Sequence, residues 1–212
     1  MKYYTLTNST EIKKIGHYPQ TSVSDGNELF SPFSNVRIVL GDFPKTIPKL
    51  CLILNEKSII TDFLDAIVIP FGLIVNEKIK NLLPIFNLPK HKFYSIDVTC
   101  NKKLLDYYWL HNYDNVFQYI DMDKSKFEII QYKNVVTHSF ISEDFYKSKK
   151  HECIMDFSKT FKITKIILKE NFPNYDLFEF ENRTLISKRT LDLFVENEIT
   201  GYEAKLYDII KR

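Results

Sequence analysis

The side chains most often used for catalysis or metal binding are scattered along this chain. Its five histidines stand far apart, at His17, His91, His111, His138 and His151. None lies in H-E-x-x-H or another metal-ligand spacing, and the three cysteines form no C-x-x-C pair. We therefore expect neither a metal site nor a disulfide framework.

Two local groups of reactive side chains have simpler explanations than catalysis. His151-Glu152-Cys153 places a base beside a nucleophile, but adjacent residues of a helix or strand point in different directions. Asp121 and Asp123 offer two carboxylates, yet lysines stand where a calcium loop needs its glycine and its final glutamate. We interpret the first group as a chance adjacency and the second as a turn.

Signatures of phosphate binding and of serine hydrolases are absent from the sequence. The chain has only five glycines and contains no G-x-G-x-x-G, G-x-x-x-x-G-K or G-x-S-x-G. We expect a protein that is not an enzyme and that binds no cofactor. The alternative that stays open is a small hydrolase or nuclease whose site is assembled from dispersed His, Asp and Glu side chains.

An aromatic segment, Tyr107-Tyr108-Trp109-Leu110-His111, is a candidate for recognition. In a strand, Tyr107, Trp109 and His111 share one face. Such side chains are frequent anchors at the centre of protein interfaces, but large aromatics on a strand are equally typical of a core. The core interpretation is favoured, and the recognition interpretation requires that these side chains be exposed.

Composition indicates a folded domain and argues against disorder or nucleic-acid binding. The 212 residues are 44% hydrophobic and 26% charged, with 29 basic and 27 acidic side chains spread along the sequence. Only four of the basic residues are arginines, which leaves few groups for bidentate phosphate or base contacts. The longest apolar run, residues 66–75, is too short to cross about 30 Å of hydrocarbon, and we recognise no secretory signal. We expect a cytoplasmic protein without direct contact to membrane or nucleic acid.

The order of apolar and turn-forming residues predicts an α+β fold, made mainly of antiparallel strands with a few short helices. Strands are expected at residues 36–40, 50–54, 104–110, 127–132, 163–168 and 177–180. A short helix is expected from a Thr61 or Asp62 cap to residue 67, and a helix or linker at residues 142–150. We expect a single domain over residues 1–212; two joined lobes, about 1–135 and 136–212, are the alternative.

Two segments repeat one pattern of apolar strand, capping residue, helix and further strand. In the first, residues 73–75 precede an Asn76 cap; in the second, Leu185-Ile186 precede a Ser187 cap. The helices that follow each place apolar residues on one face. The two segments are either a structural pseudo-repeat or a chance recurrence of a common unit.

Seven short segments, in their order along the chain, carry a resemblance to a known family. They are Asn8–Gln20 (NSTEIKKIGHYPQ), Thr61–Leu64 (TDFL), Gly72–Leu83 (GLIVNEKIKNLL), Phe86–Tyr94 (FNLPxHxFY), Asp106–His111 (DYYWLH), Ile120–Phe127 (IDMDKSKF) and Ile199–Glu203 (ITGYE). Together they resemble the myxobacterial-type family of bacterial immunity proteins from polymorphic toxin systems. The chain departs from the family at Val75-Asn76-Glu77-Lys78, where the family has a Ser-Glu-Lys cap, and over residues 133–159.

The resemblance implies a non-enzymatic cytoplasmic protein that binds a cognate toxin protein, encoded by an adjacent gene, and blocks the toxin's active site. It carries over no catalytic residue. Such a role calls for a preorganised surface that buries on the order of 1,600 Å² and whose charges complement those of the toxin. Candidate contact residues are Tyr107, Trp109 and His111, if exposed, and the acidic pair Glu143 and Asp144, if the toxin is basic. The sequence leaves the oligomeric state open.

Overall fold

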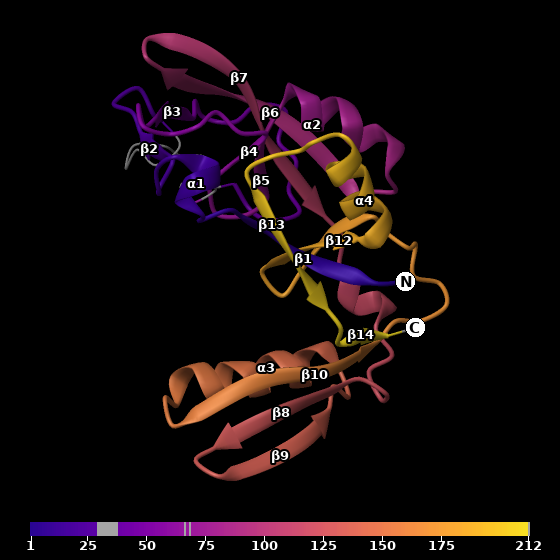
Figure 1. The fold of residues 1–212 in the computed structure, drawn as a ribbon. Helices are drawn as coiled ribbons and strands as arrows, with labels where there is room; N and C mark the ends of the chain where they lie inside the picture. Colours follow the sequence, from indigo (N-terminus) through magenta and orange to yellow (C-terminus); the bar gives the residue numbers. More distant parts are fainter. Residues whose placement is uncertain (29–37, 66, 68, 212) are drawn as a thin grey trace. The chain divides into compact units, whose positions relative to one another are not determined.

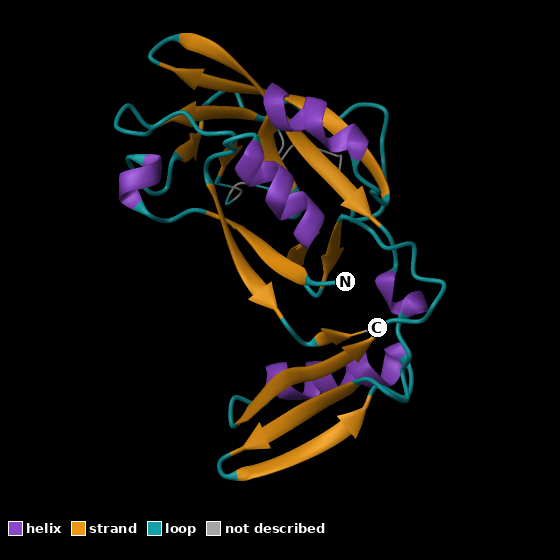
Figure 2. Cartoon of the chain, turned by 45° about the vertical axis from the view of Figure 1, so that its right-hand side comes forward, coloured by secondary structure: helices purple, strands orange, loops and turns teal. Residues whose placement is uncertain are grey.

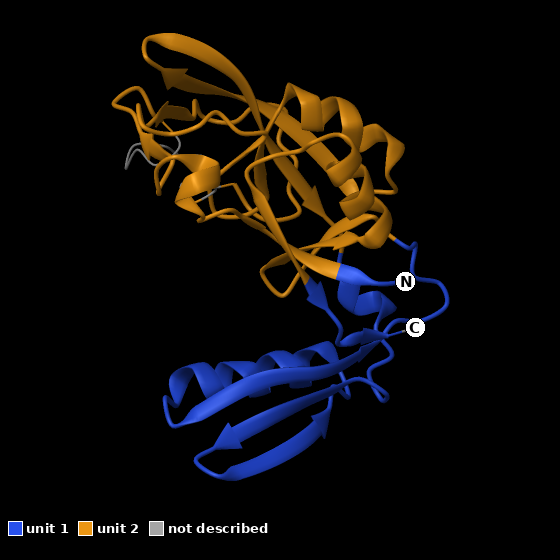
Figure 3. Ribbon diagram, viewed as in Figure 1, with its two compact units in different colours: residues 1–3, 115–174, 206–212 blue, residues 4–114, 175–205 orange. Residues whose placement is uncertain are grey.

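The chain divides into two compact units (Figure 3). The computed structural model describes residues 1–28, 38–65, 67 and 69–211. Unit 1 comprises residues 1–3, 115–174 and 206–212, and unit 2 comprises residues 4–114 and 175–205. Most of unit 1 is therefore an insertion between two stretches of unit 2. Neither boundary of this insertion falls at residue 135.

The described residues of unit 2 form two sheets and three short α-helices (Figures 1 and 2). The six-stranded sheet has the order β2-β3-β6-β7-β5-β4, and the four-stranded sheet has the order β11-β12-β1-β13. The strands are β1 (Tyr3–Asn8), β2 (Thr21–Val23), β3 (Cys51–Leu54), β4 (Phe63–Leu64), β5 (Leu73–Asn76), β6 (Lys90–Cys100), β7 (Lys103–Tyr113), β11 (Leu177–Phe180), β12 (Arg183–Ser187) and β13 (Tyr202–Tyr207). The helices are α1 (Ile12–Ile15), α2 (Glu77–Leu82), the 3₁₀ helix η1 (Leu83–Ile85) and α4 (Lys188–Glu196).

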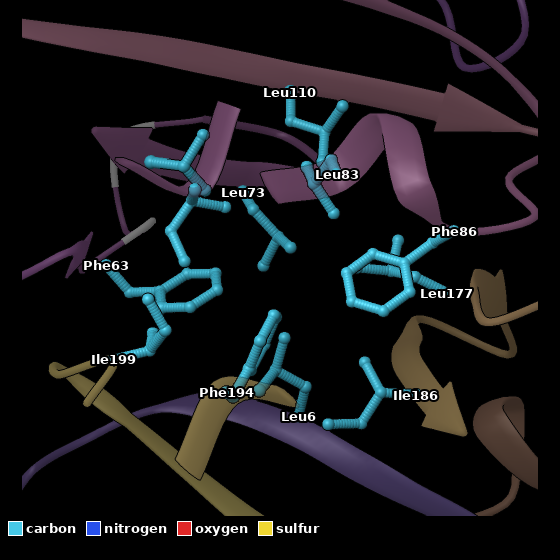
Figure 4. Packing of buried hydrophobic residues seen from close by; sticks show 12 residues of the cluster. Leu6, Phe63, Leu73, Leu83, Phe86, Leu110, Leu177, Ile186, Phe194 and Ile199 are labelled. Atoms are coloured by element: carbon cyan, nitrogen blue, oxygen red, sulfur yellow. The ribbon is translucent and has the colours of Figure 1, made fainter. Parts of the chain in front are cut away.

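The middle of the six-stranded sheet is buried on both faces. Side chains that alternate along its strands enter two different apolar clusters: Val75 and Leu110 face one, whereas Ile74 and Trp109 face the other. The first cluster also takes side chains from β1, α2, β11, β12 and α4, and Figure 4 shows Phe194 of α4 among them. Burial on both faces explains why β5 is an uninterrupted apolar run, since neither of its faces meets water.

Unit 1 is a small sheet with one longer helix. Its elements are the 3₁₀ helix η2 (Val116–Tyr119), β8 (Lys126–Gln131), β9 (Asn134–Ser139), α3 (Glu143–Met155), β10 (Lys159–Ile167) and β14 (Ile210–Lys211), and the sheet order is β14-β10-β8-β9. The core of the unit is aromatic: the ring of Phe127 lies 4.7 Å from that of Phe161 and 5.7 Å from those of Phe140 and Tyr146, centroid to centroid. These contacts hold α3 against the sheet.

The α+β class predicted from the sequence is confirmed: the sheets are mostly antiparallel and the helices are few and short. The stretch at residues 142–150 is a helix rather than a linker, because Ser142 accepts the amide of Phe145 at 3.1 Å and caps α3. Of the strand predicted at residues 36–40, residues 36 and 37 lie outside the described residues and 38–40 form no strand.

The short helix predicted from Thr61 or Asp62 is wrong. Phe63 and Leu64 instead form β4, which pairs antiparallel with Val75 and Ile74. The carboxylate of Asp62 is used for other contacts, described below, so it caps no helix here. Residues 66 and 68, at the end of that predicted helix, lie outside the described residues. Within the part of the chain that is described, no helix has the length and apolar character needed to cross a membrane.

Candidate functional site

Asp62 is a buried carboxylate that joins two distant segments of unit 2. Its Oδ1 accepts the side-chain amide of Asn76 at 2.8 Å, and Asn76 in turn caps α2 by accepting the amide of Ile79 at 3.2 Å. Its Oδ2 accepts both the amide of Thr200, at 2.7 Å, and the Thr200 hydroxyl, at 2.8 Å. Thr200 lies in the loop after α4. Asp62 therefore links the start of α2 to the end of the α4 segment.

Asp176 makes the reciprocal connection. Its Oδ1 accepts the hydroxyl of Ser187 at 2.7 Å, and Ser187 caps α4 by accepting the amide of Thr190 at 3.2 Å. Its Oδ2 accepts the amide of Asn87 at 3.0 Å, and Asn87 follows α2 and η1. The Arg189 guanidinium also donates to Oδ2, at 2.8 Å. Asp176 thus links the start of α4 to the end of the α2 segment.

The two segments therefore correspond in structure as well as in sequence pattern. The carbonyl of Asp62 accepts the amide of Asn76, as the carbonyl of Asp176 accepts the amide of Ser187. In both segments the aspartate precedes a two-stranded antiparallel ladder, β4–β5 or β11–β12, that leads into the capped helix. We call Asp62 and Asp176 the reciprocal aspartates. Of the two alternatives left by the sequence, this shared bonding pattern favours the pseudo-repeat.

A surface groove of about 880 Å³ lies beside the loop that Asp62 holds. Its lining comes from α1, α4 and the start of β13: Glu11, Lys14, Leu191, Ile199, Thr200, Gly201, Tyr202, Glu203 and Ala204. Gly201 has a φ of +84°, and a Cβ there would lie 2.3 Å from the carbonyl oxygen of Phe63, so no larger residue fits. The groove wall is thus fixed by backbone contacts.

The groove has the composition of a protein-binding surface. Its apolar part comes from Leu191, Ile199 and Tyr202, and the Tyr202 ring packs on that of Phe194 at 5.4 Å. Its charged side chains have partners: the ammonium group of Lys14 pairs with the carboxylate of Glu11 at 2.6 Å. Glu203 accepts the hydroxyl of Ser9 at 3.0 Å. Protein interfaces likewise combine apolar and charged side chains.

Tyr107, Trp109 and His111, the aromatic recognition candidates, are buried, with exposures of 2%, 0% and 0%. The recognition interpretation required exposed side chains, so it does not hold. The three residues lie in the core, as the favoured interpretation predicts. Trp109 donates from Nε1 to the carbonyl of Phe71 at 2.8 Å. These side chains organise the interior of unit 2 and present no surface to a partner.

His111 is enclosed by other rings. It stacks on Phe43 at a centroid distance of 4.4 Å and lies 4.6 Å from Phe71. Its Nε2 accepts the amide of Gly41 at 3.2 Å, which requires the neutral ring. Burial lowers the pKa of His111 to about 4, although Asp42 acts in the opposite direction.

Glu143 and Asp144, the acidic candidates, lie in the first turn of α3 in unit 1. Asp144 is exposed, whereas Glu143 is partly covered and pairs with Lys147 at 2.6 Å. Acidic side chains in a first turn stabilise a helix through its dipole, so their position has a structural reason as well. This pair belongs to unit 1, whereas the three aromatic candidates belong to unit 2.

Two further groups of reactive side chains, at Asp121–Asp123 and at His151–Cys153, are arranged as the sequence predicts. Asp121 Oδ1 accepts the amide of Lys124 at 3.2 Å, as expected of a turn. On α3, His151 is exposed while Cys153 is buried, so the two point apart. Among the described residues, no three His, Cys, Asp or Glu side chains gather where they could hold a metal ion.

Sequence reasoning missed the groove and Asp176. One available signal was the recurrence of aspartate followed by two apolar residues, Asp62-Phe63-Leu64 and Asp176-Leu177-Phe178, ahead of each capped helix. In comparisons with known proteins, no protein-family model matches the chain, and no curated protein matches it.

Replacing Asp176 by alanine should lower the free energy of unfolding by about 2–4 kcal/mol, because the Asn87 amide and the Ser187 hydroxyl lose their acceptor in a buried setting. Asp192→Ala is the matched control: Asp192 pairs with Lys188 on the exposed side of α4, and its loss should cost less than about 1 kcal/mol. Urea denaturation monitored by circular dichroism measures both. Equal losses would contradict the role given to Asp176.

Acid should destabilise unit 2 through His111. The folded pKa, about 4, lies below the ordinary value of 6.5, so the stabilisation is present above pH 6.5 and is lost as the pH falls towards 4. His111→Phe keeps the ring stacking and removes this titration. The difference in unfolding free energy between the wild type and His111→Phe should therefore shift by up to about 3 kcal/mol between pH 7 and pH 4. A difference that does not change with pH would refute the assignment.

Proposed function

We propose that this protein is a cytoplasmic immunity protein that binds a cognate bacterial toxin domain and occludes its active site. The observation that carries the proposal is the ordered resemblance of seven segments to immunity proteins of polymorphic toxin systems. Six of these segments belong to unit 2. The toxin is expected to be the product of an adjacent gene.

The contacts among those segments support the proposal. The Thr61–Leu64, Gly72–Leu83 and Ile199–Glu203 segments meet at Asp62, through its bonds to Asn76 and Thr200. The Asn8–Gln20 segment reaches the same place, because the Ser9 amide donates to the carbonyl of Gly201 at 2.9 Å. Four of the seven segments, although far apart in the sequence, are therefore joined by hydrogen bonds in one region.

The groove is the surface we assign to the toxin within this proposal. It is lined by the Asn8–Gln20 and Ile199–Glu203 segments, so the resemblance and the concave surface coincide. A wall fixed by hydrogen bonds loses little conformational entropy when a partner binds, which favours tight association. The alternative surface is the start of α3, where Asp144 is exposed and suited to a basic partner.

The alternative function, a small hydrolase or nuclease with a dispersed site, would need acidic or imidazole groups free to act on a substrate. The reciprocal aspartates are instead saturated by hydrogen bonds to backbone and side chains. We find no observation that favours this alternative. Turnover by the purified protein that depends on one acidic or imidazole side chain would establish it.

The proposal is tested by co-expression with the product of the adjacent gene. Cells that express this product should survive when the present chain is supplied, and the two proteins should co-purify as a stable complex. Absence of both protection and complex would overturn the proposal. Protection without a complex would contradict occlusion as the mechanism.

Lys14→Glu should weaken toxin binding at least about tenfold, because it reverses a charge in the lining of the groove and sets two acids side by side at Glu11. Lys13→Glu is the matched control, since Lys13 is exposed on the same helix and does not line the groove. Asp144→Lys tests the other surface. Isothermal titration calorimetry of the three variants with the toxin distinguishes the two surfaces. A loss of affinity confined to Asp144→Lys would assign the interface to α3 rather than to the groove.

A further inference from the structure

Strand β9 is the free edge of the sheet in unit 1, and it lacks the features that normally keep sheet edges from pairing. The strand order places it at one end, beside β8 alone. An edge strand directs the N–H and C=O groups of every second residue away from its sheet. Proteins guard such edges with short strands, charged side chains, proline or bulges. β9 has six residues, NVVTHS, and pairs with β8 without a register shift.

The remaining sheet edges among the described strands are protected. β2, β4, β11 and β14, at the ends of their sheets, have only two to four residues each. β14 pairs with Ile166 and Ile167 alone, so most of β10 has no partner strand on that side, but this part carries Lys159, Lys162 and Lys165. β3 likewise pairs only with residues 97–99 of β6, whose unpaired part carries Lys90 and Lys92. β13 is as long as β9, but it carries Glu203 and Lys205, whose charges oppose pairing with another strand. β9 is therefore the edge left open to a further strand.

Apolar side chains extend the surface around β9. Val135 and Val136 are 55% and 53% exposed, and Tyr132, in the turn before the strand, is 84% exposed. Phe157, in the turn between α3 and β10, is 99% exposed. That turn lies at the same end of the unit as Tyr132, because Gln131 donates from Nε2 to the Ser158 hydroxyl at 2.9 Å. Val135 and Val136 are consecutive in β9 and face opposite sides of the sheet, so apolar side chains flank the open edge on both sides.

We propose that β9 pairs antiparallel with β9 of a second copy of this chain, about a two-fold axis, so that the two sheets of unit 1 become one continuous sheet. A second copy fits this edge because β9 has no charged residue, so identical strands side by side bring no like charges together. A two-fold axis also makes the same patch serve both partners.

A dimer needs apolar contact area beside the paired strands, about 800 Å² for each partner of a standard interface. Part of it is supplied on and next to β9, where Val135, Val136 and Tyr132 are each more than half exposed, and the open backbone edge of β9 adds to it. This pairing concerns unit 1 and does not depend on the proposed toxin binding at the groove of unit 2.

Sedimentation velocity of the purified full chain, over roughly 1–100 µM, tests the proposal. The wild type should reach twice the monomer mass of 25.2 kDa. Val135→Lys should stay monomeric, because it places a cation on the paired edge. Val23→Lys is the matched control, a valine 44% exposed on the edge strand β2, and it should remain dimeric.

A wild type that is monomeric over the whole concentration range would overturn the proposal. The β9 edge would then be available to pair with a strand of a different protein. A Val135→Lys variant that dimerises like the wild type, or a Val23→Lys variant that dissociates equally, would also overturn the proposal. Circular dichroism shows whether Val135→Lys is folded. If it is not, Thr137→Lys, at another exposed position of β9, makes the same test.

Discussion

Two buried carboxylates connect the two halves of unit 2, because each binds the N-cap residue of one helix and the loop that follows the other. A buried carboxylate is costly unless hydrogen bonds satisfy it, and charge-assisted bonds to amides and hydroxyls are among the stronger ones. Asp62 and Asp176 each satisfy this requirement with groups from two segments, so the cap of one helix and the end of the other are fixed together. Neither pseudo-repeat can move without disturbing the other.

This constraint connects the interior of the protein to its surface. The loop that Asp62 fixes through Thr200 is the wall of the groove, and the core beneath it contains Phe63 and Phe194. A surface built on such bonds is preorganised for a partner. Unit 1 is built differently: aromatic side chains pack one helix against a sheet. The β9 edge of this sheet has no partner strand. We propose a different partner for each surface, the toxin for the groove and a second copy of the chain for the β9 edge.

The sequence predicted elements better than it predicted the site. Apolar alternation was sufficient for the α+β class, for β7 and β8, and for the burial of Trp109, because these depend on local pattern. Asp62 was misread as a helix cap, since its actual partner Thr200 is 138 residues away and no local pattern reveals it. The groove could not be predicted for the same reason: its two walls come from opposite ends of the chain.

Native-state hydrogen exchange in an Asp62→Ala variant tests the central claim, that the reciprocal aspartates act as one unit. The variant should lose protection at the Thr200 amide, which Asp62 binds directly. It should lose protection as well at the Asn87 and Thr190 amides, whose own partners, Asp176 and Ser187, are unchanged. Faster exchange confined to Thr200 and the start of α2, with Asn87 and Thr190 protected as in the wild type, would contradict the account.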